Sequence, residues 1–157
     1  MSAVEARLAE LGHTVPEVVP PLAAYVPAVQ HGDLVFSSGQ LPMVDGVLAA
    51  TGKVGEGPGL VDPEEAHRLA GICALNAVAA VRSVVGDLDR VARVLKVVGF
   101  VASDPSFTGQ PAVVNGASEL LRAAFGEAGV HARSAVGVTS LPLDTPVEVE
   151  ITVALRD

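Results

Sequence analysis

Residues 131–150 read HARSAVGVTSLPLDTPVEVE, and they carry both the strand pattern and the charged side chains on which the fold and the function depend. They place Arg133 at the start of one apolar segment and Glu148 on the polar side of the next. A guanidinium binds a planar carboxylate through two parallel hydrogen bonds, and a nearby glutamate accepts a proton from water or a substrate nitrogen. The pair suggests a site for a small acid, although most Arg and Glu residues on strands are solvated or paired with each other.

The same stretch predicts two strands, over residues 134–139 and 147–155. In the second, five apolar residues alternate with polar or small ones, so one face is predicted to lie in the core and the other to be polar or part of an interface. The short connection between these strands favours pairing them as a hairpin.

Upstream, residues 23–29 and 34–38 are predicted to be strands joined by a turn at residues 30–33. Gly39 follows the second strand, where a glycine either brings backbone N–H groups close to a ligand or forms an ordinary turn. The glycine-rich residues 45–59 are predicted to form an irregular, mobile loop near the ligand or at its rim.

The clearest helix signal begins at Asp62, which is predicted to be the N-cap, with Pro63 in the first turn and Glu65 completing a capping box. The helix is expected to end at Val85, before Gly86. Its inner face is expected to contain small apolar residues and Asn76, whose amide is more often structural than catalytic.

A continuous strand is predicted over residues 94–101, and a second helix is predicted from Pro111 to the glycines that begin at Gly126. On that helix, four polar residues are expected to face outward as a solvated surface: Asn115, Ser118, Glu119 and Arg122. The first residues are predicted to form a short helix in which Val4, Leu8 and Leu11 share one face and Gly12 is the stop, and a proline-rich connector is expected over residues 13–22.

The composition indicates one domain with more apolar surface than a monomer of this size usually buries. Half of the 157 residues are hydrophobic, 18% are charged, and the mean hydropathy is +0.47. A homo-oligomer accounts for this excess, and so does an interior rich in Ala and Val. No apolar run reaches a membrane-spanning length without Gly, Pro, Asn or a charge, and the N-terminus carries charges unlike those of a signal peptide, so a cytoplasmic protein is expected.

Several classes of function are disfavoured. The net charge of −8, the absence of a basic run and the four Phe, one Tyr and no Trp argue against binding nucleic acid. The four histidines show no metal-ligand spacing, and no nucleophile elbow supports a Ser-His-Asp hydrolase. The only cysteine, Cys73, lies in an apolar helical pattern and is expected to be a buried, inert thiol.

Taken together, the segments around Tyr25, Ser38-Gly39-Gln40-Leu41-Pro42, Asn76, Arg133-Ser134 and Leu141-Pro142 with Glu148 resemble the YjgF/YER057c/UK114, or Rid, family. The resemblance covers about residues 20–155 and is closest to a longer-chain YjgF-like subgroup. It implies a single RidA-like domain over 1–157, in which residues 1–20 form the leading helix and connector. The implied fold is α+β: a chorismate-mutase-like mixed sheet with two long helices packed on one face. The last strand would then lie between the first core strand and the strand over 94–101, which conflicts with the hairpin.

The resemblance also implies a homotrimer with clefts between subunits. It further implies an enzymatic activity on small nitrogen compounds. Family members such as the RidA enzymes hydrolyse reactive enamines and imines, including 2-aminoacrylate, to 2-oxo acids and ammonia, without metal or cofactor. Carried onto this chain, Arg133 holds the substrate carboxylate beside Ala135, and Glu148 positions or activates water. Ser38 and Gly39 orient the substrate and Tyr25 walls the cleft.

Two alternatives stay open: a non-catalytic trimer that binds a 2-oxo acid or similar carboxylate, and, less favoured, an endoribonuclease. Relative to short members, the chain has about twenty additional N-terminal residues, a longer glycine-rich segment after Pro42 and additional residues between Phe107 and Asn115. These differences leave the substrate and the activity of the subgroup open.

Overall fold

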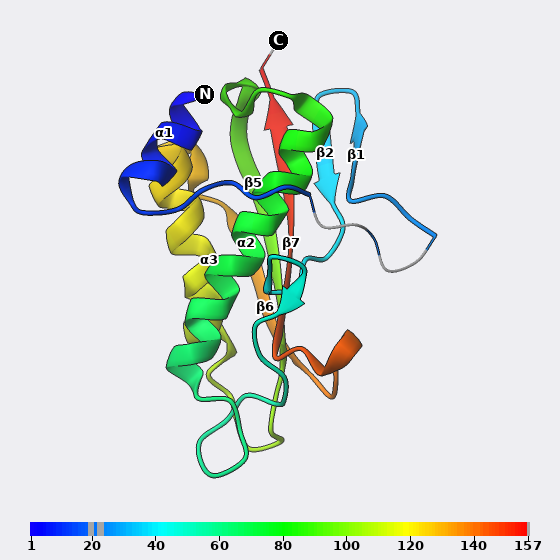
Figure 1. The fold of residues 1–157 in the computed structure, drawn as a ribbon, viewed down its shortest axis with the longest axis vertical. Helices are drawn as coiled ribbons and strands as arrows, with labels where there is room; N and C mark the ends of the chain where they lie inside the picture. The colour runs from blue at the N-terminus through cyan, green and yellow to red at the C-terminus, as the bar shows by residue number, and fades with distance from the viewer. Residues whose placement is uncertain (19–20, 22–23, 157) are drawn as a thin grey trace.

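A computed structural model describes residues 1–18, 21 and 24–156 (Figure 1). The helices are α1 (Ala3–Glu10), α2 (Pro63–Val85) and α3 (Gln110–Phe125), with short 3-10 helices η1 (Leu88–Arg90), η2 (Gly126–Gly129) and η3 (Pro142–Asp144). The strands are β1 (Ala28–His31), β2 (Leu34–Ser37), β3 (Met43–Val44), β4 (Val47–Leu48), β5 (Val91–Ala102), β6 (Ala132–Val138) and β7 (Val147–Leu155).

The main sheet is mixed and has the order β1-β2-β7-β5-β6. Strand β7 is antiparallel to both of its neighbours, whereas β5 and β6 are parallel and are connected through α3. A parallel pair needs such a crossover, and here β6 lies on the far side of β5 from β7, so β6 and β7 do not pair. The predicted hairpin is therefore wrong, and the position implied by the resemblance holds, with β2 as the N-terminal neighbour of β7.

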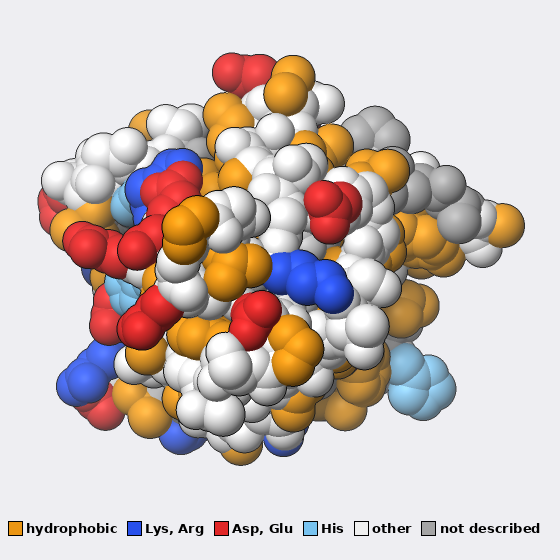
Figure 2. Space-filling model, turned by 90° about the horizontal axis from the view of Figure 1, so that it is seen from below, with side chains coloured by type: hydrophobic (Ala, Val, Ile, Leu, Met, Phe, Trp, Pro, Cys, Tyr) orange, Lys and Arg blue, Asp and Glu red, His pale blue; other side chains and the backbone are white. Residues whose placement is uncertain are grey.

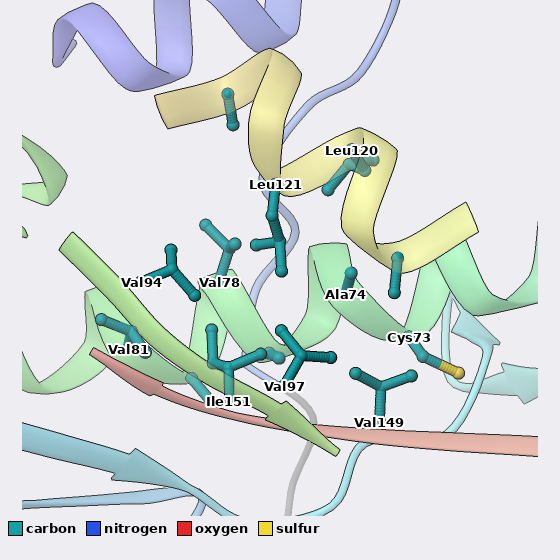
Figure 3. Packing of buried hydrophobic residues seen from close by; sticks show 14 of the residues in the cluster. Cys73, Ala74, Val78, Val81, Val94, Val97, Leu120, Leu121, Val149 and Ile151 are labelled. Carbon is teal, nitrogen blue, oxygen red and sulfur yellow. The ribbon is translucent and has the colours of Figure 1, made fainter. Parts of the chain in front are cut away.

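Both long helices pack on one face of this sheet (Figure 1). Along β7, alternate residues from Val147 to Leu155 are buried and the intervening ones are partly exposed, as the sequence alternation predicts. In Figure 3, Val97 of β5 and Val149 and Ile151 of β7 face the side chains of α2 and α3. We call this side of the sheet the core face and the opposite side the open face. The mixed α+β architecture expected from the sequence is confirmed.

The predicted boundaries of α2 are confirmed, but its capping box is not. The Asp62 side chain accepts a hydrogen bond from the backbone N–H of Glu64 at 2.8 Å, and Gly86 ends the helix at a positive φ of 76°. Glu65 instead pairs with Arg68, at 2.6 Å. The capping box of this chain is at α1, between Ser2 and Glu5, where the sequence reading did not place one.

By length and composition α2 is apolar enough to cross a membrane, but most of its apolar window is buried inside the fold. Cys73 on its inner face is fully buried, which raises the pKa of its thiol, and the predicted buried thiol is confirmed. Asn76 donates to the carbonyl oxygens of Leu41 and Met43 at 2.9 and 3.0 Å, so it holds the segment after β2, a structural role.

Three predictions for the N-terminal part of the chain, on its helix, connector and first strand, need correction or concern residues that the structure does not describe. Leu11 is 55% exposed because α1 ends at Glu10 and its buried face is limited to Val4 and Leu8. The first strand begins at Ala28, not at 23, and residues 19, 20, 22 and 23 of the expected connector and strand lie outside the described residues.

The glycine-rich segment contains regular structure, whereas an irregular loop was predicted. It starts with a small hairpin of β3 and β4, whose turn residues Asp45 and Gly46 both have positive φ. Further along, Val54 is fully buried and bridges Val61 and Ser103. The segment is thereby attached to the end of β5, because one apolar residue within it reaches the core.

Candidate functional site

Arg133 lies in β6, an edge strand of the sheet, and its side chain is held by α3. Its register partner is Val97, a core-face residue, so Arg133 points to the helical side. Its Nη1 donates to Asn115 Oδ1 at 2.8 Å and to Ser118 Oγ at 3.2 Å, and its Nη2 donates to the carbonyl oxygen of Pro111 at 3.3 Å. Three acceptors from one helix therefore fix the plane of the guanidinium.

These contacts leave part of the guanidinium available to a ligand. Arginine has five N–H donors, and those to α3 use at most three. The Nε–H of Arg133 is one of the donors left over, because its contacts with α3 are all made by Nη1 and Nη2. Two parallel N–H groups are the geometry that grips one carboxylate.

Ala135 lies two residues beyond Arg133 on the same face and pairs with Gly99. It is partly buried and packs against the core. The structure thus brings these two predicted residues together at the edge of the sheet.

The sequence reading missed Asn115 and Ser118 as site residues and assigned them to a solvated face. Asn115 is exposed, as expected, and Ser118 is partly buried. Their spacing of three residues puts them on one side of α3, and that signal was present in the sequence. The sequence did not show that β6 lies next to this side of the helix, because that follows only from the crossover connection.

A second group of predicted residues gathers on the open face, around Glu148. The backbone of Gln40 exchanges hydrogen bonds with Val149 at 2.8 and 3.0 Å, which lays the Ser38–Gln40 segment beside β7. A Cβ atom on Gly39 would collide with the carboxylate of Glu148. Glycine is therefore required for this side chain to take its observed position. Burial, and then the neighbouring Glu150, raises the pKa of the half-buried Glu148.

Ser38 precedes Gly39 in this group and holds the segment that follows Tyr25. The Ser38 hydroxyl donates to the carbonyl oxygen of Val26 at 2.6 Å, and its backbone N–H donates to Pro27 at 2.8 Å. The Tyr25–Pro27 segment consequently runs along the end of β2, with the Tyr25 side chain 45% exposed.

One chain does not bring Arg133 and Glu148 together. Arg133 shares its row of the sheet with Val97 and points to the core face, whereas Glu148 pairs with Phe100 and points to the open face. Strand β5 also separates their strands. The predicted residues thus fall into two groups, which we call half-sites: Arg133 with Ala135 on the helical side, and Glu148 with Ser38 and Gly39 on the open side, where Ser38 also holds the segment that follows Tyr25.

Among the described residues, no group of three or more His, Cys, Asp or Glu side chains is placed to hold a metal ion. One half-site instead offers the N–H donors of a guanidinium to an anion. The other offers a carboxylate whose pKa is raised.

A family model described as "YjgF/chorismate_mutase-like, putative endoribonuclease" matches residues 5–154. The chain belongs to this YjgF family. Protein TCP17 of Trypanosoma cruzi is 43% identical over 155 residues, covering 98% of this chain and 95% of that protein. The N-terminal helix and the glycine-rich segment therefore fall within the similarity.

Solved structures divide into closer and more distant YjgF-like folds. A protein of unknown function from Agrobacterium tumefaciens is 46% identical, with a TM-score of 0.90 and coverage of 98% of this chain and 93% of that one. TdcF from E. coli, whose structure contains bound serine, is 25% identical, with a TM-score of 0.58 over 90% of this chain and 93% of that one. The chain is similar in fold to both.

Proposed function

We propose that this protein is an enamine/imine deaminase that hydrolyses reactive 2-imino and enamino acids, such as 2-aminoacrylate, to 2-oxo acids and ammonia. The observation that carries the proposal is the guanidinium of Arg133, held by three acceptors on α3 with at least two of its five N–H donors, Nε–H among them, left for a carboxylate. The bound serine of TdcF, an amino acid with a carboxylate, supports a ligand of this class in the family.

The chemistry needs few groups. An imine carbon is already electrophilic, so a bound carboxylate and a positioned water are sufficient to direct the reaction. Glu148, as a carboxylate, accepts a proton from the water that attacks the carbon and passes it to the imine nitrogen, which gives a carbinolamine. The hydroxyl proton of the carbinolamine then passes to the nitrogen as the C–N bond breaks and the carbonyl forms, so imino acid and water yield 2-oxo acid and ammonia. The raised pKa of Glu148 makes it a stronger base for this step.

Both half-sites serve one ligand when copies of the chain form a homotrimer, with Arg133 from one copy facing Glu148 of the next. The open face supports this assembly because it carries exposed apolar side chains that no helix of the described residues covers, among them Val29, Phe36 and Val136, each more than 40% exposed. Apolar patches of this kind mark protein interfaces.

The first alternative, a non-catalytic trimer that binds a 2-oxo acid, keeps Arg133 and does not depend on Glu148. The second, an endoribonuclease, has the printed description of the family in its favour and the charge against it. The chain has a net charge of −8, and on the face shown in Figure 2 the Lys and Arg side chains are scattered among acidic ones. Binding a phosphate backbone depends on clustered basic residues.

The deciding experiment is a coupled assay in which an amino-acid dehydratase or oxidase generates imino acids and release of the 2-oxo acid is followed. Wild-type protein is expected to accelerate release, and Arg133→Ala is expected to lose nearly all of this activity while it remains folded. Arg68→Ala is the matched control, because it removes an arginine that also makes a short hydrogen-bonded contact, to Glu65, on an exposed helix surface.

The outcomes separate the candidates. Full activity in Arg133→Ala contradicts the carboxylate grip. No acceleration by wild type with any amino acid tested, together with binding of the 2-oxo acid, favours the non-catalytic alternative.

A further inference from the structure

His131 lies two residues before Arg133 and shares a hydrogen-bond partner with it. The Nε2 atom of His131 is 2.9 Å from Ser118 Oγ, and the same hydroxyl oxygen is 3.2 Å from Arg133 Nη1. The other ring nitrogen, Nδ1, is 2.6 Å from the carbonyl oxygen of Gly129. A continuous chain of contacts therefore runs from the backbone of η2 through the imidazole and the hydroxyl to the guanidinium.

Only one arrangement of hydrogens satisfies this chain with a neutral ring. A carbonyl oxygen can only accept, so Nδ1 of His131 carries the hydrogen and Nε2 is the acceptor. Ser118 must then donate its hydrogen to Nε2, which leaves its lone pairs directed at the Arg133 N–H. The imidazole thus orients the hydroxyl, and the hydroxyl orients the guanidinium.

The surroundings keep the ring neutral. Burial lowers the pKa of His131, the hydrogen bond to the Gly129 carbonyl opposes this, and the positive charge of Arg133 lowers the pKa further, so the net shift is downward. Two more arginines are close: Arg122 lines a surface pocket together with His131 and Arg133, and Arg93 donates to the neighbouring Val130 carbonyl at 3.1 Å. The acidic residues of α3 and η2 are engaged elsewhere, since Glu119 pairs with His67 at 3.0 Å and Glu127 lies 3.8 Å from Arg122.

We propose that His131 and Ser118 are positioning residues that act in series, His131 through Ser118, to hold the Arg133 guanidinium in the orientation that binds the substrate carboxylate. The proposal rests on the carboxylate-binding role of Arg133 given above and adds two residues that do not touch the ligand. Asn115 holds the same Nη1 from the other side, so loss of the hydroxyl loosens the guanidinium without releasing it.

The test measures binding of a 2-oxo acid, 2-oxobutyrate, and of its methyl ester by calorimetry. Ser118→Ala is expected to weaken binding of the acid about tenfold, the scale of one hydrogen bond to a charged group, and His131→Phe about five- to tenfold. Binding of the ester is expected to change less than twofold in both. Ser118→Thr, which keeps the hydroxyl, is expected to stay within about threefold of wild type. Ser83→Ala on α2 and His67→Phe are matched controls.

The double variant tests the order of action. If His131 acts through Ser118, the Ser118→Ala/His131→Phe protein binds the acid no more than twofold more weakly than Ser118→Ala alone. Multiplied effects of the two substitutions, an equal loss for the ester, or no loss in Ser118→Ala overturns the proposal. Steady-state kinetics add a second criterion, because a positioning role for the grip raises KM more than it lowers kcat.

Arg133→Ala separates this proposal from the proposed function. If it abolishes acid binding while Ser118→Ala and His131→Phe bind normally, the series is wrong and the carboxylate grip stands. If wild type fails to bind the acid, or Arg133→Ala binds it normally, the grip itself is wrong and the series is overturned with it.

Discussion

At Gly39, the addition of a single methyl group is expected to lower turnover much more than stability. A methyl group there would occupy the position of the Glu148 carboxylate, which is the end of a flexible side chain and can move away. Gly39→Ala is therefore expected to cost less than about 1 kcal/mol of stability but to lower turnover by roughly 10²-fold, because a displaced base no longer meets its proton. Turnover in the imino-acid assay and thermal melting check this pair of effects.

Gly71→Ala is its control. The nearest atom to a Cβ at that position is the Gly116 oxygen at 3.5 Å, an ordinary contact, and turnover should be unchanged. A Gly39→Ala protein with wild-type turnover would contradict the assignment of Glu148 as the base.

Glu148 also sets the expected pH dependence. The base must be ionised, and burial raises its pKa above the ordinary value of 4.5. As the pH falls through that raised pKa, kcat/KM is expected to fall about tenfold per pH unit, and Glu148→Gln should lose the acid limb together with about 10²- to 10⁴-fold of the rate. An acid limb that persists in Glu148→Gln would assign it to another group.

The same shift has the opposite sense for stability. A carboxyl whose pKa is raised in the folded state stabilises the protein most when it is protonated, so its contribution is lost as the pH rises through the raised value. Glu148→Gln should therefore be slightly more stable than wild type at neutral pH, and the difference should vanish in acid.

Among the elements, α1 is attached to the fold by its buried Val4 and Leu8 and by polar contacts, several of them at its first turn. Glu5 accepts from Ser2 at 2.8 Å within the capping box and from Arg82 of α2 at 2.9 Å, and the Ser2 backbone N–H and Arg82 lower its pKa to about 2. Glu5→Gln is expected to cost about 1 kcal/mol at pH 7 by denaturant titration.

The stabilising effect of a depressed pKa is fully present above the unfolded value of about 4.5 and is lost as the pH falls toward 2. The difference between wild type and Glu5→Gln should shrink over that window. Glu10→Gln on the exposed side of α1 is the control, and an equal loss there would argue against the capping box as the cause.

The crossing of α2 and α3 depends on Gly116. A Cβ at this position would overlap the backbone carbonyl of His67, which cannot turn aside within a helix. Gly116→Ala is expected to destabilise the protein by about 1–3 kcal/mol, whereas Gly71→Ala on the facing helix is expected to be neutral or slightly stabilising. Chemical denaturation of the two variants tests whether the close approach is at Gly116.

Local sequence signals predicted the long elements well, because their determinants are local. Asp62 and Gly86 mark the ends of α2, and the alternation in β7 gives its buried face. The hairpin proposed for the last two strands was wrong because strand order depends on the route of the whole chain through α3. Only the family resemblance supplied that order.

The candidate site was predictable in part for the same reason. Arg133, Glu148 and Gly39 stand out by residue type and by the motifs around them. The contacts of Arg133 with Asn115 and Ser118 were not predictable, since an exposed polar pair on a helix looks like a solvated surface until a strand is placed beside it.

For the whole molecule, the two half-sites make a prediction about mixed assemblies. If each cleft takes Arg133 from one copy and Glu148 from its neighbour, a mixture of Arg133→Ala and Glu148→Gln chains regains clefts in which both residues are intact. Random assortment at equal amounts gives about a quarter of the clefts. The check is to refold the two inactive proteins together and assay them, with each refolded alone as the control; no regained activity would place both residues of a cleft in one chain.

The opposite orientations of Arg133 and Glu148 have one further consequence, for newly made protein. A chain that folds alone already holds its guanidinium and its carboxylate in their final places, yet the sheet stands between them. If the proposed trimer forms the cleft, such a chain is inert until it meets other copies, and activity per molecule should rise with protein concentration and fall on dilution. The concentration of the protein would then control its activity per molecule.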